Sequence, residues 1–155
     1  MEIKLASNTI PNEHIDSLSN WLKTFPKLTK GDLTIKFEQQ FSKFLGCSQS
    51  RLVNSGSSAN LLIAAANLHY EKLKSLKIGI PAVSWSTTLA PFIQLGYEPI
   101  LIDCDPINLG INIDHLTKII KEDKISSLIL VHVLGHDSNI NKIKDICFEH
   151  KIRLF

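Results

Sequence analysis

The chain has 155 residues, of which 44% are hydrophobic and 21% are charged, a balance typical of a single soluble globular domain. The formal net charge is only +2 and the lysines are scattered, so the charge pattern does not indicate a nucleic-acid partner. The sequence has no apolar run long enough to cross a bilayer and no signal-peptide core, so we expect a cytoplasmic protein with no membrane partner.

The first part of the chain, residues 1–50, is predicted to be a helical segment. Apolar spacing predicts a helix over residues 12–23, which Pro26 ends because proline cannot continue a helix. Asp32 is a predicted N-cap of a second helix, since its side-chain oxygen can accept from exposed N–H groups. Gly46 is the predicted C-terminal stop of that helix.

Residues 51–155 alternate between short apolar runs and longer helical patterns, which is typical of a mostly parallel α/β sheet covered by helices on both faces. Predicted strands cover residues 51–54, 77–81, 99–103 and 128–133 and begin again at Arg153. Predicted helices cover residues 57–73, 87–95, 113–121 and 141–150. The chain ends within an apparent strand, so we expect it to be a fragment whose residues 51–155 form an incomplete domain.

The three cysteines, Cys47, Cys104 and Cys147, show no metal-ligand spacing. An odd number of cysteines without a secretion signal indicates reduced thiols in a cytoplasm. We interpret all three as small buried residues.

A run of small polar residues, "NSGSS", joins the first predicted strand to its helix at residues 54–58. The first N–H groups of a helix lack internal partners and carry partial positive charge, and Gly56 lets a ligand approach the backbone. Ser57 and Ser58 can add hydroxyl donors, so the run could bind a phosphate. The commoner alternative is a serine-capped helix without a ligand. The residues of a P-loop or a nucleophile elbow are absent.

Trp85 lies in the next strand-to-helix connection, among serines and threonines. An aromatic ring at the carboxyl end of a strand could stack on a planar ligand, although a half-buried loop tryptophan is the commoner case. A phosphate-binding turn and a stacking ring on neighbouring connections together predict a flat, phosphorylated cofactor, a description that pyridoxal phosphate fits.

Two further motifs have weaker interpretations. Asp103 and Asp105 follow an apolar strand, as in haloacid-dehalogenase-type phosphatases, but Ile107 stands where that signature has Thr or Val, so we prefer hydrogen bonds to a turn. His132 and His136 are four residues apart with no helix to align them, which argues against a zinc site. We expect His132 to line the pocket or to fill the end of the sheet.

An ordered set of segments carries a family resemblance: "LTKGD", "VNSGSSANLL", "PAVSWSTTLAP", "LIDCDP", "LGINID" and "VHVLGH". Together they resemble the DegT/StrS family of pyridoxal-phosphate enzymes that act on nucleotide-linked keto sugars. The resemblance is strongest to the branch of sugar 3-dehydratases that includes those acting on GDP-4-keto-6-deoxymannose. It implies a fold-type-I aminotransferase-like large domain with a mostly parallel, seven-stranded sheet, here truncated.

The resemblance also implies site residues. Gly56 and Ser57 would hold the phosphate of pyridoxal 5'-phosphate or pyridoxamine 5'-phosphate, with a smaller role for Ser58, and Trp85 would stack on the pyridine ring. The turn that would touch the nucleotide-linked keto sugar consists of Pro26, Lys27, Leu28 and Thr29.

The expected activity of the intact protein is that of a 3-dehydratase, which converts a nucleotide-linked 4-keto-6-deoxy sugar to its 3-deoxy form for surface polysaccharide biosynthesis. The alternatives are a nucleotide-sugar aminotransferase of the same family and a non-catalytic remnant. Family members place an acidic partner of the pyridine nitrogen, a serine and a catalytic Lys or His beyond the position of Phe155. We therefore expect no catalytic residue within this chain and no catalysis by the chain alone. The resemblance also implies a homodimer for the full-length protein.

Overall fold

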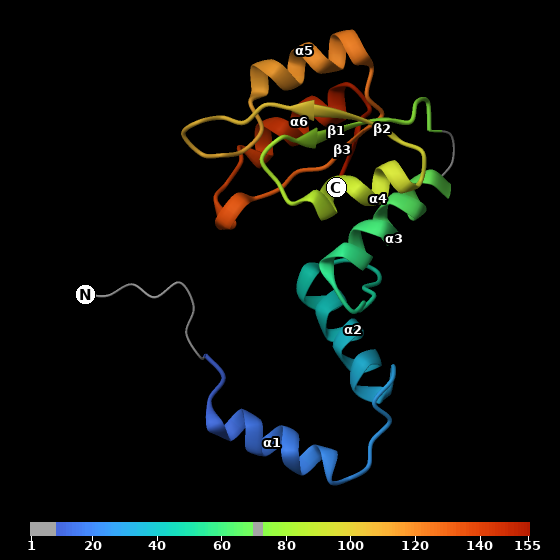
Figure 1. The fold of residues 1–155 in the computed structure, drawn as a ribbon, viewed down its shortest axis with the longest axis vertical. Helices are drawn as coiled ribbons and strands as arrows, with labels where there is room; N and C mark the ends of the chain where they lie inside the picture. The colour runs from blue at the N-terminus through green and yellow to red at the C-terminus, as the bar shows by residue number, and fades with distance from the viewer. Residues whose placement is uncertain (1–8, 70–72) are drawn as a thin grey trace, which may run out of the picture. The chain divides into compact units, whose positions relative to one another are not determined.

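The computed structural model describes residues 9–69 and 73–155. The chain divides into two compact units, residues 1–52 and residues 53–155 (Figure 1). Each unit is described by itself below.

The first unit contains two amphipathic helices, α1 (Asn12–Leu22) and α2 (Asp32–Leu45), as the sequence predicts. Gly46 follows α2 with φ of 69°, in the left-handed conformation, so the predicted helix stop is confirmed. The predicted cap is wrong, because Asp32 is the first helical residue and Gly31 holds the N-cap position without a side-chain hydrogen bond. Asp32 instead places a negative charge in the first turn, where the helix dipole favours it.

A buried carboxylate organises the end of the first unit. Glu38 on α2 is only 6% exposed, and its Oε1 accepts a hydrogen bond from the N–H of Leu52 at 2.9 Å. The guanidinium of Arg51 lies 3.5 Å from the other carboxylate oxygen. The predicted strand over residues 51–54 is therefore wrong: these residues take no place in the sheet, and one of their backbone donors bonds to a side chain instead.

The second unit is a four-stranded parallel sheet in the order β2-β1-β3-β4. The strands are β1 (Lys77–Pro81), β2 (Glu98–Ile102), β3 (Ser127–Leu128) and β4 (Arg153–Leu154). The helices are α3 (Gly56–His69), α4 (Ser86–Gln94), α5 (Ile113–Asp123) and α6 (Ile140–Glu149), with a short 3-10 turn, η1 (Val133–Gly135). The predicted α/β class and these four helices are confirmed. The first of them was predicted to run to Leu73, which is not helical, and residues 70–72 of that prediction lie outside the described residues.

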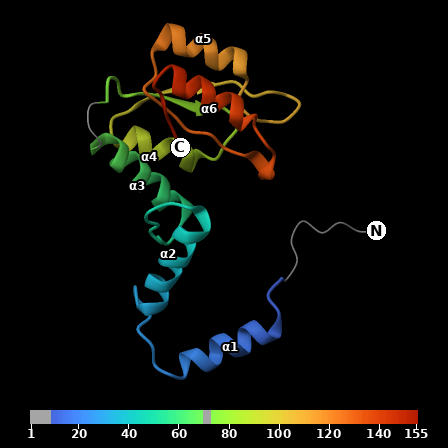
Figure 2. The same cartoon turned by 180° about the vertical axis from the view of Figure 1, so that it is seen from behind.

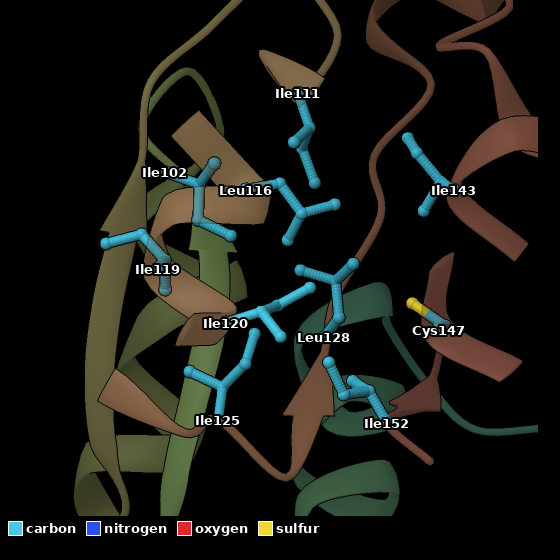
Figure 3. Packing of buried hydrophobic residues seen from close by; sticks show 10 residues of the cluster. All are labelled: Ile102, Ile111, Leu116, Ile119, Ile120, Ile125, Leu128, Ile143, Cys147 and Ile152. Atoms are coloured by element: carbon cyan, nitrogen blue, oxygen red, sulfur yellow. The ribbon is translucent and has the colours of Figure 1, made fainter. Parts of the chain in front are cut away.

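Helices cover both faces of this sheet (Figures 1 and 2). One core packs α5 and α6 against the sheet and is built largely from isoleucine and leucine, with Cys147 at its edge (Figure 3). The other core packs α3 and α4 against the opposite face through Ala64, Ile78, Ile80 and Phe92. Because helices cover both faces of the sheet, successive residues along a strand are apolar.

The third strand is shorter than predicted. The sequence predicts residues 128–133, but β3 pairs over only Ser127–Leu128. Ladder-like bonds continue for two residues, since the N–H of Ile129 donates to Gly79 at 3.0 Å and that of Leu130 donates to Phe155 at 2.8 Å. The chain then turns into η1, so it leaves the sheet early.

A buried polar network ties α3 to the sheet. Asn67, 2% exposed, donates from Nδ2 to the hydroxyl of Ser127 at 2.9 Å, and Arg153 donates to its Oδ1. Buried amides are stabilising only when such partners exist. The network therefore fixes α3 against the starts of β3 and β4.

The cysteines differ in exposure. All three are free thiols, but only Cys147 is buried, while Cys47 is exposed and Cys104 is half-buried. The prediction of three buried cysteines is therefore wrong for Cys47, which lies after the C-terminal end of α2 in the first unit.

Burial raises the pKa of the Cys147 thiol from its ordinary value of 9.0 to about 11. At pH 8 we expect an alkylating reagent to modify Cys47 rapidly and Cys147 only after unfolding, because the thiolate is the nucleophile. The raised pKa also means that this thiol stabilises the fold below pH 9 and that its contribution is lost as the pH rises toward 11. Mass spectrometry of alkylated peptides checks this prediction, and equally fast labelling of both residues would contradict it.

Candidate functional site

At the N-terminus of α3, two backbone donors have no partner among the residues that the structure describes. The first four N–H groups of a helix have no helical acceptor. Here the hydroxyl of Ser55 accepts from the N–H of Ser58 at 3.2 Å, and the carbonyl of Ser55 accepts from Ala59 at 3.0 Å. Among the described residues, no acceptor is bonded to the N–H groups of Gly56 and Ser57. A pair of adjacent, free donors at a helix start can bind an anion.

The start of α3 has features of both alternatives, the serine-capped helix and the phosphate-binding turn. Ser55 is a serine cap, as the ligand-free interpretation expects, yet the cap uses only two of the four donors. Ser58 is engaged with Ser55, whose hydroxyl donates to its Oγ at 3.2 Å. Ser57 is exposed and its hydroxyl makes no hydrogen bond to a described residue, so it is available to a ligand.

Gly56 is not required by the fold. It is the first residue of α3, it does not have a left-handed φ, and a Cβ placed on it would meet no atom within 4 Å. The space beside the two free N–H groups is therefore open. A glycine that neither the backbone conformation nor the packing explains fits a site where another group approaches the backbone closely.

Trp85 stands at the N-cap position of α4, directly after the loop that follows β1. Its side chain is 83% exposed, so the alternative of a half-buried loop tryptophan is wrong. The loop itself is ordered by bonds at both ends: Ser84 donates to the carbonyl of Pro81 at 3.0 Å, and Thr88 donates to the carbonyl of Trp85 at 2.9 Å. A ring held on a fixed backbone and open on its faces can stack on a planar ligand.

The side chain of Asn60 connects the N-terminal ends of α3 and α4. Asn60 of α3 donates from Nδ2 to the carbonyl of Thr87 in α4 at 2.9 Å. No pattern taken from the sequence pointed to Asn60. The one sequence signal for it is the proline in α4, because a proline leaves the carbonyl four residues earlier without its helical donor.

The aspartates after β2 make turn contacts, as we preferred over the phosphatase alternative. Asp103 accepts from the N–H of Cys104 at 2.9 Å, and Asp105 accepts from that of Ile107 at 2.8 Å. His132 is exposed at the start of η1, so it does not fill the end of the sheet. Within residues 9–69 and 73–155, no group of three His, Cys, Asp or Glu side chains could hold a metal.

The predicted substrate turn borders a hollow of its own in the first unit. The hollow has a volume of about 320 Å³. Its lining consists of Trp21, Pro26, Lys27, Leu28, Gly31, Asp32, Leu33 and Thr34. Three of the four predicted turn residues are in this lining and Thr29 is not. Gly31 packs tightly there, since an added Cβ would lie 2.9 Å from the carbonyl oxygen of Lys27.

Trp21 is a second residue that sequence analysis missed. It is half-buried at the end of α1 and shares the hollow with the turn. An aromatic ring beside a lysine suits a ligand that has both a flat base and negative charge.

A hollow of about 960 Å³ in the second unit lies at the opposite end of the strands. It is bordered by residues that precede or begin β1, β3 and β4. Its Lys77 is already paired, 3.5 Å from Asp123 and 3.6 Å from Glu98. Ligands of open α/β sheets bind outside the carboxyl ends of the strands, so we place the functional site at the helix starts instead.

Residues 8–155 match the DegT/DnrJ/EryC1/StrS aminotransferase family. The chain belongs to this family. It is 34% identical over 146 residues to the GDP-4-keto-6-deoxy-D-mannose 3-dehydratase of Yersinia pseudotuberculosis, which covers 92% of this chain and 36% of that protein. It is 31% identical over 134 residues to the dTDP-4-dehydro-2,6-dideoxy-D-glucose 3-dehydratase of Saccharopolyspora spinosa, covering 83% of this chain and 29% of that protein.

Solved structures agree with this family membership. The chain superposes with a TM-score of 0.88 and 32% identity on a GDP-4-keto-6-deoxymannose-3-dehydratase that holds a trapped PLP-glutamate geminal diamine. That match covers 99% of this chain and 40% of the other chain. The chain thus spans about a third of the length of the curated dehydratases it matches, at their N-terminal part. The fold-type-I aminotransferase-like architecture predicted from the sequence is confirmed.

Proposed function

We propose that this chain is the N-terminal, cofactor-phosphate-binding part of a pyridoxal-phosphate or pyridoxamine-phosphate-dependent enzyme. The intact enzyme converts a nucleotide-linked 4-keto-6-deoxy sugar to its 3-deoxy form, for surface polysaccharide biosynthesis. One observation carries the proposal: the two N–H groups left free at the start of α3 belong to Gly56 and Ser57, the residues that the family resemblance assigns to the cofactor phosphate. The similarity to 3-dehydratases supports the reaction type.

The residues at the helix starts fit this cofactor. The N–H groups of Gly56 and Ser57 would donate to phosphate oxygens, the Ser57 hydroxyl would add a third donor, and the dipole of the 14-residue helix α3 would favour the anion. Trp85 offers an exposed face to a planar ring. When bound, the cofactor supplies an electron sink for a carbanion beside the sugar's C4. This chain's residues bind and orient it, and they move no proton.

In the first unit, the turn of Pro26, Lys27, Leu28 and Thr29 is the proposed contact with the nucleotide sugar. Lys27 places a cation in the hollow described above, which suits a diphosphate. Trp21 adds a surface for the base. The proposed domain division is a helical segment over residues 1–50 and an incomplete cofactor-binding domain over residues 51–155.

The proposed setting of the enzyme is the cytoplasm, and the proposed assembly of the full-length protein is a homodimer without a nucleic-acid partner. In the part of the chain that the structure describes, no helix has the length and apolar character needed to traverse a bilayer.

An aminotransferase is the second candidate, favoured by the family to which the chain belongs. It would use the same cofactor site and the same substrate class. The difference lies in whether the 3-hydroxyl is expelled or an amino group is left at C4. The family places the residue that decides this, Lys or His, outside this chain.

A product assay on the full-length protein tests the proposal. The protein is given pyridoxamine 5'-phosphate and GDP-4-keto-6-deoxymannose, and the sugar product is identified by mass spectrometry. We expect a product that has lost the oxygen at C3. An amino sugar would assign the aminotransferase activity instead. Turnover of neither kind, with no change in cofactor absorbance on adding protein, would contradict both and favour the non-catalytic remnant.

A further inference from the structure

Helix α4 contains a proline at a position where a backbone donor is expected. Pro91 is the sixth residue of α4 (Ser86–Gln94) and is buried. In a regular helix its N–H would donate to the carbonyl of Thr87, four residues earlier, but proline has no N–H. The Thr87 carbonyl therefore lacks its helical donor.

A side chain from the neighbouring helix supplies that donor. The Nδ2 of Asn60 lies 2.9 Å from the Thr87 carbonyl oxygen, across 27 residues of sequence. Both helices pack on the same face of the sheet, where the hydroxyl of Tyr97 also donates to the Ala64 carbonyl of α3 at 3.0 Å. The proline of one helix and the asparagine of the other thus form a complementary pair.

The bond joins the two places where the proposed cofactor is held. Asn60 follows Gly56 by one helical turn, and residues four apart lie on one side of a helix. Thr87 follows Trp85 by two residues, in the first turn of α4. The distance between a phosphate and the ring that bears it is fixed by covalent bonds. A site that binds both the phosphate and the ring therefore needs its N–H donors and its stacking face at one fixed distance from each other.

We propose that Asn60 is a positioning residue: its bond to the Thr87 carbonyl, vacated by Pro91, sets the separation between the N–H groups of α3 and the ring of Trp85. This inference rests on the proposed function. In this role Asn60 would act through the position of α4 and not through a contact with the cofactor. Its role is to hold the start of α4 at the position where the phosphate and the ring of one cofactor can be bound at the same time.

The test compares two ligands on the full-length protein. In an Asn60→Ala variant the α3 donors remain, so inorganic phosphate should bind as in the parent. Pyridoxal phosphate should bind about fivefold more weakly, the effect of losing one hydrogen bond that positions the ring. At saturation it should also quench Trp85 less. The fluorescence quenching of Trp85 is obtained by subtracting the signal of a Trp85→Phe variant. This subtraction removes the contribution of Trp21.

The matched variants are Pro91→Ala and the double variant Asn60→Ala/Pro91→Ala. Alanine at position 91 returns an N–H to the Thr87 carbonyl, so the loss of stability caused by Asn60→Ala should be smaller in that background. The weakened pyridoxal-phosphate binding should persist in the double variant, because the bond between the helices is still absent. The double variant also keeps the test usable if Asn60→Ala alone folds poorly.

Two results would overturn the inference. One is unchanged pyridoxal-phosphate affinity and Trp85 quenching in Asn60→Ala. The other is full recovery of both in the double variant, which would mean that Asn60 serves only the stability of α4. If the parent protein itself shows neither binding nor Trp85 quenching, the proposed function fails, and that outcome is distinguishable because it precedes any substitution.

Discussion

Replacing Gly56 with alanine is expected to weaken binding of the cofactor phosphate about tenfold or more, equivalent to about 1.4 kcal/mol, without destabilising the fold. A Cβ at this position meets no atom within 4 Å, so the protein accommodates it. Each Cα–Cβ bond of a helix tilts toward its N-terminus, which directs the new methyl group at the approach to the free N–H groups. The fold should gain about 0.4–1 kcal/mol, because alanine has less freedom than glycine in the unfolded chain.

Absorbance titration of the full-length protein with pyridoxal phosphate measures the binding, and urea unfolding measures the stability. The matched control is Ser57→Ala, which removes a hydroxyl but keeps both N–H groups, so its loss of affinity should be smaller. Equal affinity in Gly56→Ala and the parent would mean that the phosphate does not approach the start of α3.

Replacing Gly110 with alanine is expected to lower the free energy of unfolding by about 1–3 kcal/mol, the usual cost of overpacking. A Cβ on Gly110 would lie 2.6 Å from the Cβ and 2.9 Å from the Cα of Ser138. Ser138 is completely buried and its hydroxyl donates to the carbonyl of Val131 at 3.2 Å, so it cannot move aside freely. The clash involves a backbone atom, and the connections that follow β2 and β3 must separate to relieve it.

Chemical denaturation of the full-length protein measures this loss. A Ser138→Gly change in the same chain removes the Cβ and hydroxyl that the new methyl group meets, so the double variant should recover part of the lost stability. Unchanged stability in Gly110→Ala would contradict the close packing of these two connections. The same glycine-to-alanine change is thus expected to have opposite effects on stability at positions 56 and 110.

Periodicity predicted most of the helices because a helix satisfies its backbone hydrogen bonds within itself, and it predicted the paired strands from their apolar runs. The helices at α4, α5 and α6 were placed within two residues, and β1 was placed at its true bounds. Residues 51–54 were wrongly predicted to be a strand, because a strand also needs a neighbour to pair with, and the buried carboxylate of Glu38 takes the N–H of Leu52 instead. That side chain belongs to a helix earlier in the chain, and nothing local in the sequence announces the bond.

The candidate site was also indicated by local sequence patterns. Small polar residues at a helix start and a tryptophan in the next connection indicated a phosphate site and a stacking ring. In the part of the chain that the structure describes, the unbonded N–H groups of Gly56 and Ser57 and the exposure of Trp85 are compatible with both predictions. The bond from Asn60 to Thr87 was not predictable from spacing, because it depends on how two helices pack.

The most direct test of the account is a crystal structure of the full-length protein with pyridoxamine 5'-phosphate. The account predicts phosphate oxygens within hydrogen-bonding distance, about 2.7–3.2 Å, of the backbone nitrogens of Gly56 and Ser57. It also predicts the pyridine ring against the face of Trp85. A phosphate held elsewhere, with the start of α3 bound only to solvent, would contradict the central claim that this helix start is the cofactor-phosphate site.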